Sequence, residues 1–195
     1  MSFINVLGHS FVSRLWKDIR NHRDPALIPN LNLYESGVRV RFCGIGGATI
    51  DTFLNDVHGK VHKELIKIPP KIGLVQIEGN DLDTEGFEKE VYAVKVREFV
   101  CRLHTRYNVE LVVICEIFGR LRLRTLDIDR YHIIRDEVNL TFFIEFSREE
   151  GVKFWRHKGG LMTNEDLFLP DKVHLNLKGT VKFYRSLRGA VIFLI

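Results

Sequence analysis

The sequence has few cysteines and no long hydrophobic run. The three cysteines, Cys43, Cys101 and Cys115, lie far apart and form no CxxC pair, which argues against a zinc site or redox centre and favours an intracellular, cytoplasmic location. No apolar stretch reaches the roughly 18 residues of a membrane span, and the N-terminus lacks the positive segment of a secretory signal. There is no internal repeat and no low-complexity tract. These absences leave a soluble, packed protein as the expected class.

The composition is that of an ordinary folded protein. Hydrophobic residues make up 45% and charged residues 28% of the 195 positions, which excludes disorder and collagen-like repeats. This length predicts one domain over residues 1–195. The chain begins at an expected strand and stops just after an expected helix, as a domain excised from a longer product would. The net charge of +4 permits contact with nucleic acid without requiring it.

Short apolar runs alternate with longer segments of helical period, which predicts an α/β protein with a five-stranded, mainly parallel sheet. The predicted strands cover residues 3–7, 38–42, 72–77, 110–117 and 152–155. Helices are predicted over residues 10–23 and 87–103, the second with an inward stripe of Phe87, Val91, Val94, Phe99 and Leu103. A further helical stripe consists of Ile134, Val138, Phe142 and Phe146. The last helix should begin near Asn176, a good N-cap, and turn Tyr184, Leu187 and Val191 inward.

The residues that follow each strand are the candidates for chemistry, because open parallel sheets bind ligands at the carboxyl ends of their strands. Ser10 follows the first strand at a turn into a helix, where it can be a nucleophile or, more commonly, an N-cap. Residues 43–49 follow the second strand with the sequence CGIGGAT. Such a loop either presents backbone N–H groups to a ligand or is a plain tight turn, and it lacks the P-loop lysine and the GxGxxG spacing.

Two further loops carry polar side chains. Residues 78–81, with the sequence EGND, follow the third strand, and such a loop by itself is usually a turn. Asp171 and His174 lie three residues apart ahead of the last helix. In this spacing the carboxylate can accept a hydrogen bond from one imidazole nitrogen and leave the other free as a base. A lone Asp-x-x-His pair is more often structural.

Taken together, a serine after the first strand, glycines after the second, an asparagine after the third and Asp-x-x-His before the last helix form a specific constellation. On these residues the chain resembles the SGNH (GDSL-like) hydrolase superfamily over nearly its whole length. The resemblance implies a flavodoxin-like three-layer α/β/α sandwich. The start VLGHSFVSRL also resembles the version of this domain carried in some animal retrotransposon polyproteins.

The resemblance implies a serine esterase that acts on an ester of a small acyl group such as acetyl, with no metal and no cofactor. The resemblance implies that Ser10 is the nucleophile, that His174 is the general base and that Asp171 orients the imidazole ring. The oxyanion hole would consist of the backbone amide of Ser10, that of Gly47, with Gly46 as the fallback, and the side-chain amide of Asn80.

Two residues depart from the family pattern. His9 stands where the first block usually has aspartate, and it is expected to act as a local hydrogen-bonding substitute rather than as a second base. Glu78 stands where the third block usually has glycine. A bulky acid there would hinder substrate or oppose negative charge, unless it faces away and caps a neighbouring loop.

Basic residues support a rival interpretation. Arg120, Arg122 and Arg124 alternate after the fourth strand, either as a solvated face or as a site for phosphate or nucleic acid. A second basic cluster around the fifth strand consists of Lys153, Arg156, His157 and Lys158. The rival is a module that keeps the hydrolase fold without turnover and binds RNA, DNA or a protein partner.

Overall fold

The structure is a computed structural model that describes residues 2–56, 58–77, 79–158, 161 and 164–195. Five strands form one sheet in the order β2-β1-β3-β4-β5, and all four neighbouring pairs are parallel. The strands are β1 (Ser2–Gly8), β2 (Val38–Gly44), β3 (Ile72–Gln76), β4 (Leu111–Cys115) and β5 (Val152–Trp155). This strand order is the flavodoxin-like one, so the fold class predicted from the sequence is confirmed.

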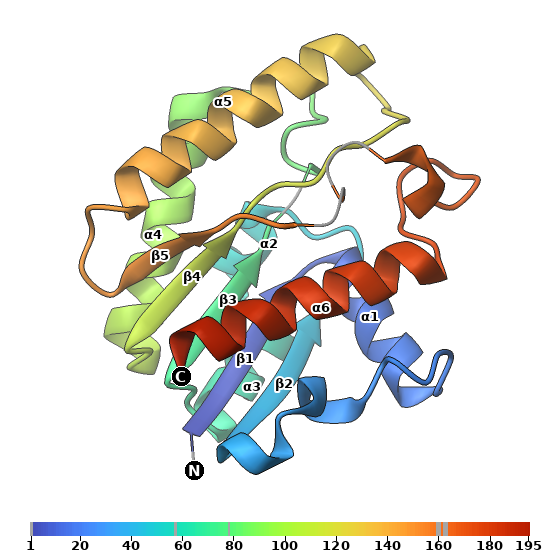
Figure 1. The fold of residues 1–195 in the computed structure, drawn as a ribbon. Helices are drawn as coiled ribbons and strands as arrows, with labels where there is room; N and C mark the ends of the chain where they lie inside the picture. The colour runs from blue at the N-terminus through green and yellow to red at the C-terminus, as the bar shows by residue number, and fades with distance from the viewer. Residues whose placement is uncertain (1, 57, 78, 159–160, 162–163) are drawn as a thin grey trace.

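Helices cover both faces of the sheet (Figure 1). One face carries α1 (Ser10–Arg20) and α6 (Leu177–Leu194), together with the short 3-10 turns η1 (Pro29–Asn32), η2 (Tyr34–Ser36) and η3 (Glu165–Leu167). The other carries α2 (Ile50–Asn55), α3 (Lys60–Lys67), α4 (Lys89–Tyr107) and α5 (Ile128–Phe146). Each face has its own hydrophobic core, because a central parallel strand such as β3 is buried on both sides. The result is the three-layer sandwich.

The last helix agrees with its prediction. The Asn176 side chain caps α6 by accepting a hydrogen bond from the Gly179 N–H at 3.0 Å. Tyr184, Leu187 and Val191 are all buried against the sheet. In α5, Val138, Phe142 and Phe146 are buried as expected, and Ile134 packs against the same core while half-exposed.

The predicted stripe of the helix over residues 87–103 is partly wrong. This helix, α4, starts at Lys89, so Phe87 lies ahead of it, and Val91 and Val94 are 45% and 56% exposed. The inward face is rotated and consists of Tyr92, Ala93, Val96, Phe99, Val100 and Leu103. Valines and alanine recur so often in this segment that several stripes fit its apolar pattern, and only packing on the sheet selects one.

The connections bring three loops to one edge of the sheet. The chain leaves β1 through α1 on one face, returns from β2 through α2 and α3 on the other, and enters β3 on the opposite side of β1. The strand order therefore changes direction between β1 and β3, and the loops that follow β1, β2 and β3 meet at their carboxyl ends. In the described residues, no helix is long and apolar enough to cross a membrane.

Candidate active site

Ser10 is the first residue of α1, directly beyond the carboxyl end of β1. Its hydroxyl lies 3.3 Å from Nδ1 of His9, the N-cap residue of this helix. Close packing forces the turn into this position, since a Cβ on Gly44 of β2 would lie 2.2 Å from the Ser13 nitrogen. The approach of α1 to the end of β2 holds the Ser10 hydroxyl at the edge of the sheet.

His174 and Asp171 lie in the loop that leads into α6. His174 Nδ1 is 2.8 Å from Asp171 Oδ2, while Asp171 Oδ1 accepts hydrogen bonds from the backbone N–H groups of Val173 and His174 at 2.9 Å each. Partial burial opposes ionisation of Asp171, but these hydrogen bonds outweigh it and lower the pKa of the carboxyl group to about 2. The carboxylate is therefore ionised at neutral pH and leaves Nε2 of His174 free to act as a base.

The cleft brings the predicted residues together. A cavity of about 570 Å³ is lined by Ser10, Gly46, Gly47, Asn80, Asp171 and His174, among others. The His174 ring is packed 6.1 Å, between centroids, from Phe11, the residue next to Ser10. No hydrogen bond joins Ser10 Oγ to His174 within the described residues, and hydrogen bonds of this kind often tighten only when substrate is bound.

The glycine-rich loop after β2 is held to the turn after β3. Asp81 accepts the Ile50 N–H at 2.9 Å, and Asn80 Nδ2 donates to the Ala48 carbonyl at 2.8 Å. Burial raises the pKa of Asp81 to about 6, although the bond from Ile50 acts in the opposite direction. Gly47 has a φ of +71°, a conformation that favours glycine. No hydrogen bond within the described chain uses the N–H of Ser10 or Gly47, so both are available to an oxyanion.

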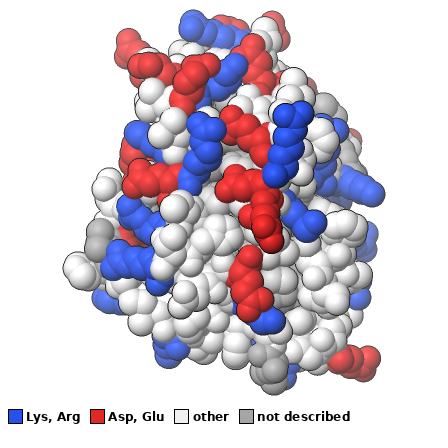
Figure 2. Space-filling model, turned by 90° about the vertical axis from the view of Figure 1, so that its left-hand side faces the viewer, with Lys and Arg blue, Asp and Glu red and all other residues white. Residues whose placement is uncertain are grey.

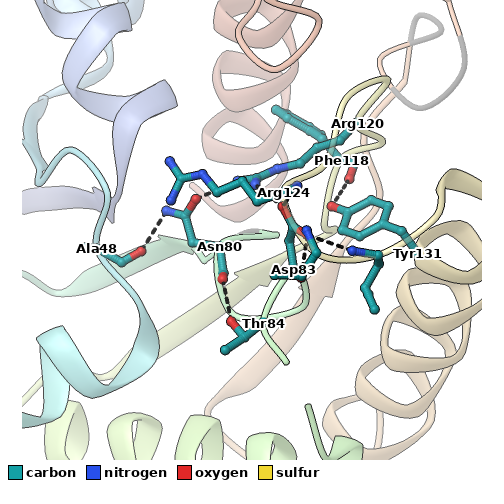
Figure 3. Close-up of polar contacts among 10 residues, drawn as sticks. Ala48, Asn80, Asp83, Thr84, Phe118, Arg120, Arg124 and Tyr131 are labelled. Carbon is teal, nitrogen blue, oxygen red and sulfur yellow. Dashed lines mark hydrogen bonds and ion pairs between the residues drawn. The ribbon is translucent and has the colours of Figure 1, made fainter. Parts of the chain in front are cut away.

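Asn80 has a second partner on its oxygen. Arg120 Nη2 donates to Asn80 Oδ1 at 2.7 Å, and Arg120 also lies 3.9 Å from Asp83 (Figure 3). Asp83 in turn accepts hydrogen bonds from the backbone N–H groups of Arg124, Thr125 and Leu126 and from the Thr125 hydroxyl. These bonds lower the pKa of Asp83 although partial desolvation opposes them. The loop after β4 is therefore tied to the turn that carries Asn80.

The three arginines after β4 do not form one exposed face, which corrects the sequence-based expectation for Arg120. Arg120 is only 5% exposed and is engaged by Asn80 and Asp83. Arg122 and Arg124 are exposed at the cleft, together with Arg14 of α1. In the part of the chain that the structure describes, these three exposed arginines form no ion pair with a carboxylate.

The second predicted basic cluster contains both exposed and buried residues. Lys153, Arg156 and Lys158 are exposed, but His157 is buried between Ser186 and Gln76, each at 2.8 Å from a ring nitrogen. Burial lowers the pKa of His157 to about 3, so it carries no charge at neutral pH. Including His157 in a basic surface was therefore wrong.

His9 was expected to make local hydrogen bonds, and its Nδ1 lies 3.3 Å from the Ser10 hydroxyl. The sequence did not predict two features of the site: the hydrogen bond of Arg120 to Asn80 and the role of Asp83 in holding the loop after β4. Neither has a local signal, because each joins segments that only the packed sheet brings together. The expectation for Glu78 concerns a residue outside those described. Among the described residues, no cluster of three or more His, Cys, Asp or Glu side chains could hold a metal ion.

The fold is shared with solved esterases at low sequence identity. A GDSL-like lipase from Bacteroides thetaiotaomicron matches with a TM-score of 0.68 and 12% identity, over 100% of this chain and 89% of its own. An acetyl esterase solved with an acetate ion matches with a TM-score of 0.68 and 14% identity, over 100% and 98%. A family 3 carbohydrate esterase from Clostridium thermocellum matches with a TM-score of 0.67 and 14% identity, over 99% and 96%. At such identities the likeness establishes the fold.

Comparisons at the level of sequence return nothing. No model of a known protein family matches the chain, and no curated protein matches it. The function must therefore be argued from the cleft itself.

Proposed function

We propose that the chain is a serine esterase that hydrolyses an ester of a small acyl group, such as acetyl. The observation that carries this proposal is that one cleft contains Ser10, Gly47, Asn80 and a His174 that is oriented by Asp171. Each of these groups has a defined part in acyl transfer, and four separate segments of the chain supply them.

The chemistry proceeds in two steps. Ser10 Oγ attacks the ester carbonyl while His174 Nε2 takes its proton, and the carbonyl oxygen becomes an anion. The N–H groups of Ser10 and Gly47 and the side-chain amide of Asn80 donate hydrogen bonds to that anion. His174 then gives the proton to the departing alcohol, which leaves an acyl group on Ser10. Water attacks this acyl enzyme by the same route, releases the acid and restores Ser10.

The small acyl group is supported by the acetyl esterase among the structural matches, whose crystal contains an acetate ion. His9 is compatible with this chemistry. It is buried, its ring centroid lies 5.7 Å from that of Phe11, and its Nδ1 lies 3.3 Å from the Ser10 hydroxyl oxygen. We assign it to positioning Ser10 and assign His174 as the base, because Asp171 leaves Nε2 of His174 available.

Hydrolysis of an aryl acetate by the wild-type chain and by Ser10→Ala tests the proposal. We expect the substitution to remove turnover almost completely, because the nucleophile is lost. Ser13→Ala is the matched control, since Ser13 lies one turn along α1 and its hydroxyl donates to the Ser10 carbonyl at 3.0 Å. Equal rates in the wild type and Ser10→Ala would refute the esterase.

A second candidate is a binding module for nucleic acid, which the resemblance to retrotransposon domains would suit. The observation in its favour is the group of exposed arginines at the cleft, Arg14, Arg122 and Arg124, without acidic partners in the described chain. The face shown in Figure 2 offers no such surface, because basic and acidic side chains are intermingled there. Salt-sensitive RNA or DNA binding that weakens in Arg122→Gln/Arg124→Gln would support this candidate, and no complex at low salt would remove it.

A further inference from the structure

Arg120 is a buried charge beside the candidate oxyanion hole. Its side chain is 6% exposed, and it lines the same cleft as Ser10 and Asn80. Burying a guanidinium is costly unless it is paired and hydrogen-bonded. Among the described residues, the nearest carboxylate is that of Asp83, 3.9 Å away, whereas the hydrogen bond to the neutral Asn80 oxygen is 2.7 Å long. Within that part of the chain, the closest partner of this charge is therefore the Asn80 amide in the cleft.

The two partners of the Asn80 side chain leave it only one orientation. The Ala48 carbonyl can only accept a hydrogen bond, so the group that faces it must be the NH₂. A guanidinium can only donate, so the group that faces Arg120 must be the amide oxygen. If the amide turned over, each partner would meet a group of its own kind (Figure 3). In the observed orientation Ala48 uses one of the two Nδ2 hydrogens, and no other acceptor in the described residues uses the second.

The residues around Arg120 hold its side chain against the turn after β3 that carries Gly79 and Asn80. A Cβ on Gly79 would lie 2.1 Å from Tyr131 Oη and 2.9 Å from Arg120 Nε, so the side chain passes where only a glycine leaves room. The Arg120 carbonyl lies 3.1 Å from His132 Nε2, and Tyr131 donates to the Phe118 carbonyl at 3.2 Å. Helix α5 thus fixes the backbone on both sides of Gly119.

We propose that Arg120 is a positioning residue of the oxyanion hole. It locks the Asn80 amide with its second Nδ2 hydrogen available to the cleft, and its charge on Oδ1 polarises the amide so that this hydrogen is a stronger donor. The proposal rests on the esterase function and adds a fourth group to the hole that acts through Asn80 rather than on the substrate.

The test is a double-mutant cycle between Arg120 and Asn80, measured as aryl acetate hydrolysis by the full chain. Loss of one oxyanion donor typically lowers kcat by on the order of 100- to 1000-fold, which is the expected result for Asn80→Ala. Arg120→Met should lower kcat roughly 10- to 100-fold with little change in KM, because Asn80 stays but is no longer held. In the Asn80→Ala background, Arg120→Met should lower kcat no further.

Controls separate this role from a purely structural one. Arg135→Met removes another arginine that is 5% exposed, bound to Asp136 and away from the cleft, and should leave kcat per folded molecule unchanged. If Arg120→Met does not fold, Arg120→Lys keeps a charge near Asp83 and replaces it in the same cycle. Added guanidinium should partly restore kcat in Arg120→Ala and not in Asn80→Ala/Arg120→Ala.

Two results would overturn the proposal. One is a wild-type kcat in folded Arg120→Met and in folded Arg120→Ala, and the other is a full multiplicative loss when Arg120→Met is added to Asn80→Ala. The failure of the esterase function itself has a different signature, which is the absence of any turnover that depends on Ser10.

Discussion

Two histidines of this protein have similar hydrogen-bond lengths and opposite environments. His174 Nδ1 is 2.8 Å from Asp171 at the cleft, and His157 Nδ1 is 2.8 Å from the hydroxyl of Ser186 in the core. The second is a genuine serine–histidine pair. Its other nitrogen is also engaged, by Gln76 Oε1, and the Ser186 oxygen further accepts from Trp155 Nε1 at 3.1 Å.

The comparison shows that a short serine–histidine distance does not define a catalytic site. At His157 both ring nitrogens are used, and burial lowers its pKa to about 3, so it can neither take a proton at neutral pH nor reach a substrate. At His174 an ionised carboxylate holds one nitrogen and leaves the other free, in the same cleft as Ser10. Access and a free nitrogen, rather than distance, distinguish the candidate base from the core residue.

The largest expected effect is that of His174→Ala. We expect kcat for aryl acetate hydrolysis to fall by at least about 1000-fold, because Ser10 loses its base. Thermal unfolding should change little, since the ring is at the surface of the cleft. Unchanged turnover in this variant would show that His174 is not the base and would make His9, whose ring contacts the Ser10 hydroxyl, the alternative.

Asp171→Asn should have the next largest effect on turnover. The amide can still accept from the backbone of Val173 and His174, but it no longer stabilises the imidazolium that forms during attack. We expect kcat to fall by on the order of 100- to 10,000-fold with KM nearly unchanged. A loss below tenfold, measured on protein with the wild-type melting temperature, would show that Asp171 has only a structural role.

His157→Ala should affect stability rather than turnover. The substitution opens a cavity beside Phe118 and Phe183 and removes one hydrogen-bond partner each from Gln76 and Ser186. We expect unfolding to become easier by about 2–4 kcal/mol in urea titrations, with kcat per folded molecule within a few-fold of wild type. A catalytic defect without loss of stability would break the distinction between the two histidines.

His157 should make the folded protein less stable as the pH falls. The pKa of His157 in the folded protein, about 3, lies below the ordinary histidine value of 6.5, so the unfolded chain binds the extra proton between these values. The stability that neutral His157 contributes is complete above about pH 6.5 and declines as the pH falls toward 3, by up to about 1.4 kcal/mol per pH unit. His157→Gln should flatten the melting temperature between pH 6.5 and 4, and an unchanged slope would argue against a neutral buried ring.

The smallest expected effect is the decrease of kcat/KM at acid pH. A histidine base must be neutral to accept the proton of Ser10, so kcat/KM should fall as the solution is made acidic, by at most tenfold per pH unit. Asp171 contributes no second step there, because its pKa of about 2 keeps the carboxylate ionised. A flat profile from about pH 5 to 9 would count against His174 as the base.

Much of the fold followed from local patterns. Strand β5 has the predicted bounds, and the ends of β1, β2, β3 and β4 differ by at most two residues from those expected. The Asn176 cap and the inward face of α6 were also legible, because capping and amphipathic spacing act over a few residues. The orientation of α4 was not, since Val91 and Val96 are the same residue type and only the neighbouring layer decides which of them is buried.

The candidate site was predictable as a set of positions and not as a set of contacts. Ser10, Gly47, Asn80, Asp171 and His174 each follow from their place relative to a strand or helix, and the structure brings them to one cleft. Arg120 looked like its neighbours Arg122 and Arg124 in an alternating run, yet one is buried and two are exposed. The Arg120 side chain passes Gly79, 41 residues earlier in the chain, where a Cβ would lie only 2.9 Å from its Nε.

By itself the sequence determined the α/β class, the order of the strands and helices along the chain and the residue types at the end of each strand, because these depend on periodicity, caps and turns within a few positions. The tertiary structure alone decided which charged groups are buried, which histidine has a free nitrogen and which way the Asn80 amide points. Those properties depend on what lies across the sheet edge from each group, through desolvation and hydrogen bonds between segments that are 30 or more residues apart.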